Sequence, residues 1–156
     1  MPSRTYPLSA PPGEVPVTVI ESGTGRRPVL LLHGGAGPDS VTGFGGALAE
    51  RFPVRVLSPV YPGFSGTARP GWLDSIAKLA GVCRRLLEDQ DLTGVLVAGS
   101  SIGGWVAAEL ALAAPERVGQ LVLGRGVPDG AGGWPPAAAG EPGGCARAVR
   151  RAGRRG

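Results

Sequence analysis

Val95 to Gly104 read V-L-V-A-G-S-S-I-G-G, an apolar run that ends in a turn rich in glycine and serine. A short run of this kind is typical of a strand buried on both faces of a sheet. The residues from Ile102 to Ala114 are apolar almost all round, which predicts a helix packed inside the protein. Ser101 is therefore expected at the centre of a sharp strand-to-helix turn, G-x-S-x-G, with its hydroxyl pushed out of the sheet.

Other segments predict the strands that would accompany this one. Residues 29–32 and 54–57 are short apolar runs, and residues 120–123 predict a further short strand. Residues 15–21 alternate apolar and polar side chains, which favours a half-exposed edge strand of antiparallel type. Because helical segments separate the buried runs, the pattern indicates an α/β fold with a parallel sheet and right-handed crossovers.

Two more helices are expected between these strands. The first follows His33-Gly34-Gly35, with Asp39 or Ser40 as its cap. Its expected inner face consists of Val41, Phe44, Leu48 and Phe52. The second follows a turn-rich loop at residues 61–66 and is expected to hold Pro70 in its first turn. Its inner face is Leu73, Ile76, Leu79 or Ala80, Cys83, and Leu86 or Leu87.

Length and charge divide the chain into two parts. Its 156 residues are enough for one domain. Residues 1–124 carry as many acidic as basic side chains, so the net charge of +4 comes entirely from residues 125–156. All but six residues of that tail are Gly, Ala, Pro or Arg. Such a segment buries too little apolar area to offset the entropy of ordering, so a disordered tail is expected.

Several interpretations of the tail stay open. Its arginines favour weak binding of polyanions over a specific nucleic-acid-binding arm. The abrupt change of composition suggests out-of-frame translation of a GC-rich gene, and the alternative is a genuine short protein. Without further strands beside it, the strand at 120–123 would form an exposed edge, through which self-association is expected.

Cysteine usage and hydropathy bear on the compartment. Cys83 falls on an apolar helix face and Cys145 lies in the tail, so they form no recognisable pair. Two unrelated thiols without a secretory signal favour a cytoplasmic location. No run approaches the ~20 apolar residues that span a bilayer, so no membrane partner is expected.

Three motifs, each after an apolar strand and in this order, carry a family resemblance. They are His33-Gly34-Gly35, Tyr61-Pro62-Gly63-Phe64, and Gly99-x-Ser101-x-Gly103. With them the chain resembles the α/β-hydrolase superfamily, in its serine-nucleophile branch, over roughly residues 15–123. The resemblance implies a partial α/β-hydrolase sheet flanked by helices over residues 1–124, followed by the tail at 125–156.

The resemblance also implies roles for individual residues. Ser101 would be the nucleophile, and the backbone N–H groups of Ile102 and Gly35 would bind the oxyanion. Glycines at 34 and 35 suit a loop whose backbone approaches the substrate closely. His33 corresponds to the family position that orients this loop, rather than to the catalytic base. The alternative for the serine is an ordinary Gly/Ser turn leading into a helix.

The chain departs from the family where the base and acid belong. The family order is Ser, then acid, then His, but His33 is the only histidine and lies upstream of Ser101. Asp129 is a weak candidate for the acid, since its surroundings equally resemble a turn. We therefore expect a serine hydrolase of small-molecule esters or amides, impaired by the missing groups. The alternative is an inactive remnant or a ligand-binding module. No cofactor or metal is implied, and the glycine-rich motifs that bind nucleotides are not found.

Overall fold

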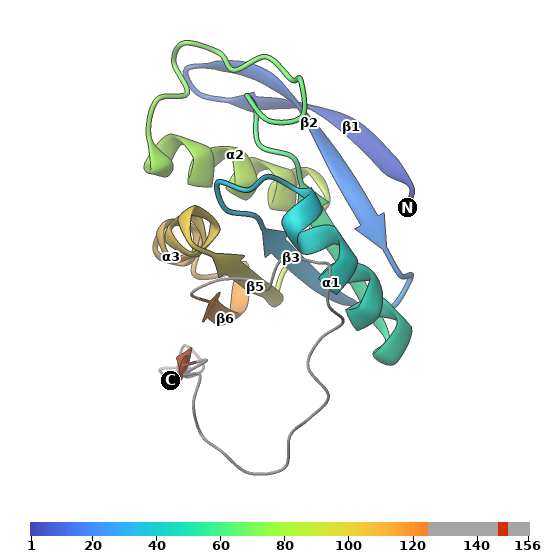
Figure 1. Cartoon of the computed structure of the whole chain (residues 1–156). Coiled ribbons are helices and arrows are strands. Elements are labelled where there is room, and N and C mark those ends of the chain that lie inside the picture. The colour runs from blue at the N-terminus through green and yellow to red at the C-terminus, as the bar shows by residue number, and fades with distance from the viewer. Residues whose placement is uncertain (125–146, 150–156) are drawn as a thin grey trace, which may run out of the picture.

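The computed structural model describes residues 1–124 and 147–149. Within them, seven strands form one mixed sheet in the order β1-β2-β4-β3-β5-β6-β7. The strands are β1 (Ser3–Ala10), β2 (Gly13–Ser22), β3 (Arg27–Leu32), β4 (Val54–Pro59), β5 (Val95–Ser100), β6 (Val118–Gly124) and β7 (Arg147–Val149). The helices are α1 (Asp39–Arg51), α2 (Ile76–Asp89) and α3 (Ile102–Ala113). Figure 1 shows these helices around the sheet.

The four central strands confirm the predicted parallel sheet. β4, β3, β5 and β6 lie side by side and run in the same direction. Leu32 of β3 is in register with Gly99 of β5, so the carboxyl ends of these two strands are neighbours. The turn after β3 and the turn that carries Ser101 therefore begin at the same edge of the sheet.

The core has two layers because successive side chains of a strand point to opposite faces. Leu30 and Leu32 face α2 and α3, in a cluster that includes Val106 and Leu110 of α3. Val29 and Leu31 face the other way, into a smaller cluster with Val41 of α1. Helix α1 thus covers one face of the sheet, and α2 and α3 cover the other (Figure 1).

The N-terminal end of the sheet differs from the prediction. The strand expected at residues 15–21 is antiparallel, as predicted, but it is not an edge strand. β1 pairs with β2 along its whole length, from Ser3 opposite Ile20 to Ala10 opposite Gly13. The proline inside β1, Pro7, argues against a central strand but is tolerated at an edge, where its missing N–H faces no partner strand.

Both predicted helix starts needed correction. Helix α2 begins at Ile76, six residues after Pro70, because the Ser75 side chain accepts a hydrogen bond from the Lys78 N–H and caps it there. Neither Asp39 nor Ser40 caps α1: its N-cap is Pro38, and the Ser40 hydroxyl donates instead to the Gly37 carbonyl.

The inner faces of these helices follow the prediction with two exceptions. Cys83 and Leu86 of α2 are buried as expected, whereas Leu73 is buried before the helix begins. Phe52 was expected on the inner face of α1, but it follows the helix as its C-cap and is 55% exposed.

Helix α3 is not covered on every side by the described residues, contrary to the prediction. The sheet and α2 bury Val106, Ala107 and Leu110. On the remaining side, Trp105 is 62% and Leu112 is 79% exposed. Among the described residues, α3 packs against the sheet and one helix, α2, so an apolar composition all round did not lead to burial on every side.

The strand at 120–123 is confirmed, but its outer edge is not unpaired as expected. β6 extends over Val118–Gly124, and Leu121 to Leu123 pair antiparallel with β7. The exposed-edge argument for self-association is therefore wrong at these residues. Apart from β7, the tail lies outside the described residues, and so do Asp129, Cys145 and the predictions of disorder and altered reading frame.

Candidate active site

Ser101 lies at the turn between β5 and α3, and its backbone has a conformation that residues other than glycine rarely adopt. Its φ is 54° and its ψ is −121°. Its N–H donates to the Gly124 carbonyl at 3.3 Å, and its carbonyl accepts from the N–H groups of Gly104 and Trp105. Ser101 is exposed, whereas the adjacent Ser100 is buried. The strained turn thus presents one serine of the pair to solvent.

Two glycines make this turn possible. A Cβ atom on Gly99 would overlap the Gly103 carbonyl, and one on Gly103 would overlap the Leu32 carbonyl at the end of β3. The start of helix α3 is therefore in direct backbone contact with β5, at Gly99, and with β3, at Leu32. The G-x-S-x-G pattern has a steric cause at both of its glycines.

The turn after β3 lies directly against Ser101. A Cβ atom placed on Gly34 would be 3.2 Å from the Ser101 Cβ and 3.8 Å from its Oγ. The corresponding position on Gly35 is 3.9 Å from the Ile102 side chain. The structure therefore brings together four of the residues singled out in the sequence: Ser101, Ile102, Gly34 and Gly35.

Two backbone N–H groups in this pair of turns have no hydrogen-bond acceptor among the described residues. No hydrogen bond joins the N–H of Ile102 or of Gly35 to a described residue. The N–H of Ile102 is in the first turn of α3, where helical N–H groups have no intrahelical acceptor and the helix dipole favours negative charge.

His33 is buried below the turn, with both ring nitrogens hydrogen-bonded. Nδ1 lies 2.8 Å from the Gly34 carbonyl, and Nε2 lies 3.2 Å from the backbone nitrogen of Tyr61. Since a carbonyl only accepts and an N–H only donates, the ring carries its proton on Nδ1 and is neutral. Burial lowers the pKa of His33, and the hydrogen bond to Gly34 opposes this shift in part.

The loop after β4 holds the other side of the His33 ring, which the sequence did not predict. The rings of Tyr61 and His33 are 4.0 Å apart, and Phe64 meets His33 edge-on at 4.8 Å. The only available signal was that both motifs follow strands of a parallel sheet, whose carboxyl ends meet at one edge. Which strands are neighbours could not be read from the sequence.

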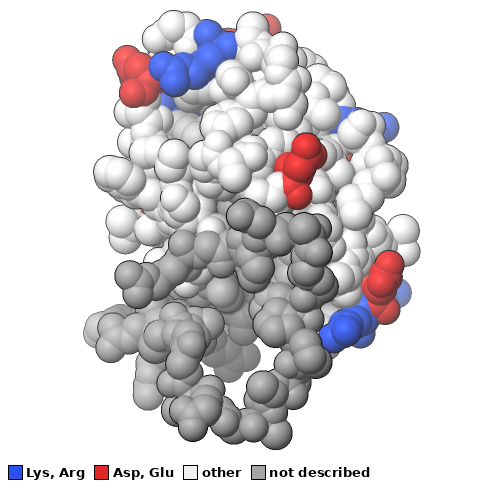
Figure 2. All heavy atoms as spheres, viewed as in Figure 1, with Lys and Arg blue, Asp and Glu red and all other residues white. Residues whose placement is uncertain are grey.

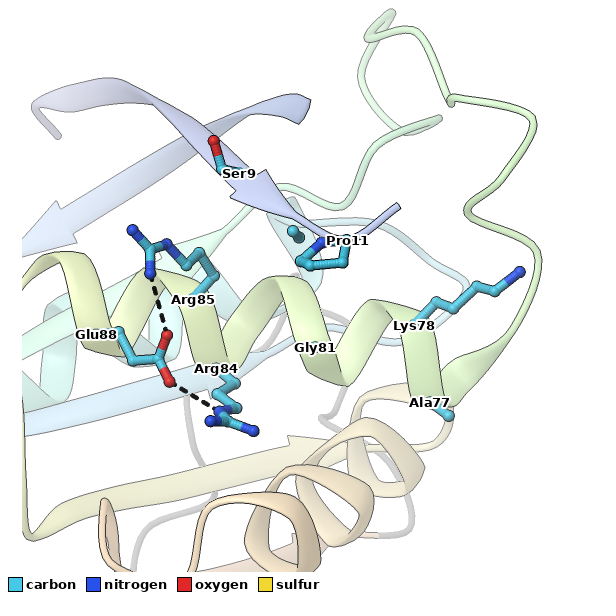
Figure 3. A pocket seen from close by; sticks show the side chains of 9 residues that line it. Ser9, Pro11, Ala77, Lys78, Gly81, Arg84, Arg85 and Glu88 are labelled. Carbon is cyan, nitrogen blue, oxygen red and sulfur yellow. Dashed lines mark hydrogen bonds and ion pairs between the residues drawn. The ribbon is translucent and has the colours of Figure 1, made fainter. Parts of the chain in front are cut away.

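A groove of about 680 Å³ lies between α2 and the turn that joins β1 to β2, and no residue of the two turns at Gly34 and Ser101 lines it. Figure 3 shows the side chains that line this groove. Its charged side chains are Lys78, Arg84, Arg85 and Glu88. Each cation has an acidic partner: Asp74 for Lys78, Glu88 for Arg84, and both Glu88 and Asp89 for Arg85. The groove presents no unpaired charge to a ligand.

Neither the charges on the face shown in Figure 2 nor metal ligands among the described residues mark another site. On that face charged side chains are few, and at the upper left and lower right acidic and basic side chains lie next to each other. No group of three or more His, Cys, Asp or Glu side chains in the described residues is arranged to hold a metal ion. None of the three helices described is long and apolar enough to cross a membrane.

Comparison with known proteins gives relatives with hydrolase activities. The chain is 39% identical over 102 residues to a pimeloyl-(acyl-carrier protein) methyl ester esterase of Nitrosomonas europaea, over 64% of this chain and 38% of that protein. It is 35% identical over 109 residues to a 2-hydroxy-6-oxononadienedioate/2-hydroxy-6-oxononatrienedioate hydrolase of Cupriavidus pinatubonensis, over 66% and 37% respectively. The chain thus spans well under half the length of these curated relatives.

Solved structures share the fold. A thermophilic esterase from Thermogutta terrifontis superposes with a TM-score of 0.67 at 29% identity, over 79% of this chain and 45% of the esterase. An epoxide hydrolase from Vigna radiata gives 0.69 at 26% identity, over 78% and 39%. The model of the alpha/beta hydrolase family matches residues 29–155. On this match, and on the sheet and turns described above, the chain belongs to the alpha/beta hydrolase family.

Proposed function

We propose that the chain carries the nucleophile and oxyanion-binding turns of a serine hydrolase that acts on ester or amide bonds through an acyl-enzyme. The observation that carries the proposal is the strained, exposed Ser101, in contact with the turn at Gly34 and next to two unoccupied backbone amides. Strain of this kind persists only where the surrounding structure holds it, and it gathers at functional sites.

The chemistry follows from the groups present. Ser101 Oγ attacks the carbonyl carbon of the substrate and loses its proton to solvent water, and the carbonyl oxygen becomes an oxyanion. The N–H groups of Ile102 and Gly35 donate to that oxyanion, and one such donor typically contributes about 3–4 kcal/mol to the transition state. The tetrahedral intermediate then expels the alcohol or amine, which takes its proton from water, and a second water hydrolyses the resulting ester of Ser101 to release the acid and restore the serine hydroxyl.

His33 and Gly34 support this arrangement without taking part in proton transfer. Both nitrogens of His33 are engaged, one by the Gly34 carbonyl and one by the Tyr61 N–H. No other histidine occurs in the sequence. We therefore propose that catalysis by this chain alone is impaired, because no second histidine is present to take the serine proton, which goes to water instead. Oxyanion binding and substrate binding still give about 10³–10⁴-fold over water in enzymes that lack a triad member.

The substrate class rests on the relatives. The Nitrosomonas relative is named as a methyl ester esterase and the Thermogutta neighbour as an esterase. A serine at the strand-to-helix turn suits that chemistry, and it disfavours the branches of the family that use an aspartate nucleophile. We propose a small-molecule ester or amide as the substrate, with no cofactor.

A second candidate is a hydrolase remnant without activity, or a module that binds ligands in the same site. The specific observation in its favour is the engaged state of His33, the sole histidine. In either case we propose a cytoplasmic location, because Cys83 is a free thiol and proteins with unpaired cysteines are typical of a reducing compartment.

The two candidates differ in the reactivity of Ser101 toward a fluorophosphonate probe. If the chain is a hydrolase, the probe modifies the wild type and Ser100→Ala, but not Ser101→Ala, and mass spectrometry finds the adduct on Ser101. Ser100→Ala is the matched control, since Ser100 is adjacent but buried. A wild-type chain without any adduct would favour the inactive remnant, and an adduct that persists in Ser101→Ala would remove Ser101 as the nucleophile.

A further inference from the structure

We propose that Thr67 is a positioning residue that acts, through His33, on the peptide carrying the Gly35 N–H. This inference rests on the proposed function, because that N–H matters for catalysis only if an oxyanion forms beside it. The evidence is a continuous set of hydrogen bonds and ring contacts from the loop after β4 to the turn after β3.

Thr67 closes the loop after β4 with its hydroxyl. The hydroxyl oxygen accepts from the Gly63 N–H at 3.1 Å, and the hydroxyl donates to the Phe64 carbonyl at 2.7 Å. The Tyr61 carbonyl is 3.4 Å from the same oxygen. One side chain therefore links the beginning, the middle and the end of the loop.

This loop has a backbone that needs such a link. Gly63, Ser65 and Gly66 all have positive φ values, of 97°, 51° and 76°. Ser65 has a side chain, for which a left-handed conformation costs about 1–2 kcal/mol. Gly63 and Gly66 adopt a positive φ at no steric cost. Ser65 keeps its conformation only where other interactions fix the loop, and the Thr67 hydroxyl provides interactions of this kind.

The loop in turn fixes the His33 ring. Its first residue, Tyr61, donates its backbone N–H to Nε2 of His33, and the rings of Tyr61 and Phe64 contact the imidazole. The donated hydrogen bond also sets the tautomer, because Nε2 can accept only while the proton is on Nδ1. A displaced loop would move the ring or release its tautomer.

His33 then sets the direction of the Gly34–Gly35 peptide. The Gly34 carbonyl accepts from His33 Nδ1 at 2.8 Å and from the Gly37 N–H at 3.1 Å. In a trans peptide the C=O and the following N–H point in opposite directions. Two donors that hold the Gly34 carbonyl therefore direct the Gly35 N–H away from them. Without those donors the peptide is free to rotate and turn its carbonyl toward the oxyanion.

The test uses the fact that His33 is the only histidine, so the full chain gives a single set of imidazole signals in ¹⁵N NMR. Thr67→Val removes the hydroxyl at nearly constant volume, and Thr67→Ser keeps it. We expect Thr67→Val to shift the His33 ring signals and to speed exchange of its Nδ1 proton. We also expect it to slow fluorophosphonate labelling of Ser101 by about threefold to tenfold, the range of one or two lost hydrogen bonds.

Thr67→Ser should retain the wild-type signals and labelling rate. Thr5→Val is the matched control, because the Thr5 hydroxyl is hydrogen-bonded to Thr18 on the exposed β1–β2 hairpin, away from the site. Circular dichroism checks folding, and Thr67→Ala replaces Thr67→Val if the valine variant does not fold.

Unchanged His33 signals in the variant without the hydroxyl would overturn the inference, and so would equal losses in the serine variant. Altered His33 signals with unaltered labelling would also overturn it, because the effect would stop short of the Gly35 peptide. If the wild type does not label at all, the proposed function fails, and the inference is then judged on the His33 signals alone.

Discussion

Two regions of this molecule bring polar groups close together, and they are built in opposite ways. The groove between α2 and the β1–β2 turn is lined by Lys78, Arg84, Arg85 and Glu88, all in ion pairs at least partly exposed to solvent (Figure 3). The edge of the sheet at Ser101 has no charged side chain in its two turns. Its polar groups are one hydroxyl, one buried imidazole and backbone amides.

The difference lies in what holds each region. Exposed ion pairs contribute little to stability and are easily rearranged. The turns at Ser101 are instead held by close backbone contact at Gly99 and Gly103 and by the hydrogen bonds of His33. Steric constraint on the backbone therefore indicates the candidate active site better than the number of charged side chains does.

The largest effect is expected from Gly103→Ala. Its Cβ would overlap the Leu32 carbonyl, which is backbone and cannot move aside. We expect a loss of about 3 kcal/mol or more in the free energy of unfolding, measured by urea denaturation, because overpacking of this kind forces the backbone to shift.

Gly81→Ala is the matched control for that variant. Gly81 lies in α2 beside the groove, and no described atom is within 4 Å of its Cβ position. Alanine in a helix interior is favoured over glycine by roughly 1 kcal/mol, so this variant should be as stable as the wild type or more so. Equal destabilisation by the two substitutions would remove the proposed steric contrast.

The next effect is a pH dependence from His33. Its pKa in the folded chain lies below the ordinary value of 6.5, mainly because of burial. The unfolded chain therefore binds the proton more readily, and stability is fully present above about pH 6.5 and falls as the pH drops below it. The slope cannot exceed about 1.4 kcal/mol per pH unit, which is the value for one proton taken up on unfolding.

Urea denaturation between pH 7.5 and 5.5 measures this slope. His33→Gln removes the titrating group, so its stability should be lower at neutral pH but nearly constant over the same range. A wild-type chain whose stability does not fall below pH 6.5 would mean that His33 protonates as easily folded as unfolded. The ring would then not be held as the two hydrogen bonds indicate.

A smaller effect is expected at the two serines with positive φ, Ser65 at 51° and Ser101 at 54°. Glycine relieves the strain at either position but adds freedom to the unfolded chain, so each Ser→Gly variant should be more stable by about 0.5–1 kcal/mol. Thermal unfolding measures this gain. Only Ser101→Gly should also abolish fluorophosphonate labelling, and a loss of stability at Ser101 would contradict the strained turn.

The smallest effect is expected in the groove. Hydrogen bonding to Arg84 is the main cause that lowers the pKa of Glu88, whose carboxylate also contacts Arg85. Glu88→Gln removes the charge from both pairs but keeps the shape. It should change stability by no more than about 1 kcal/mol and leave the labelling of Ser101 unchanged. A large loss in either measurement would show that the groove and the site are coupled.

Sequence reasoning placed the turns correctly but not their contacts. Apolar runs before His33 and Ser101 and the glycines after them were enough to predict two strand-to-turn junctions. The contact of His33 with Tyr61 depends on β3 and β4 being neighbours in the sheet, which is a property of the whole sheet. No local pattern in the sequence indicates that these two strands are neighbours.

The other errors also have local causes. β1 was not predicted because Pro7 interrupts its alternation, and the start of α2 was placed too early because Pro70 suits a first turn as well as a loop. The exposure of Trp105 could not be foreseen, because composition does not specify how many neighbours a helix has.

The most direct measurement is a crystal structure of the full chain after reaction with a phosphonate ester probe, whose bound oxygen mimics the oxyanion. We predict phosphorus bonded to Ser101 Oγ and the phosphonyl oxygen within 3.1 Å, roughly the limit for such donors, of the N–H groups of Ile102 and Gly35. An adduct at another residue, or an oxygen turned away from both amides, would contradict the account.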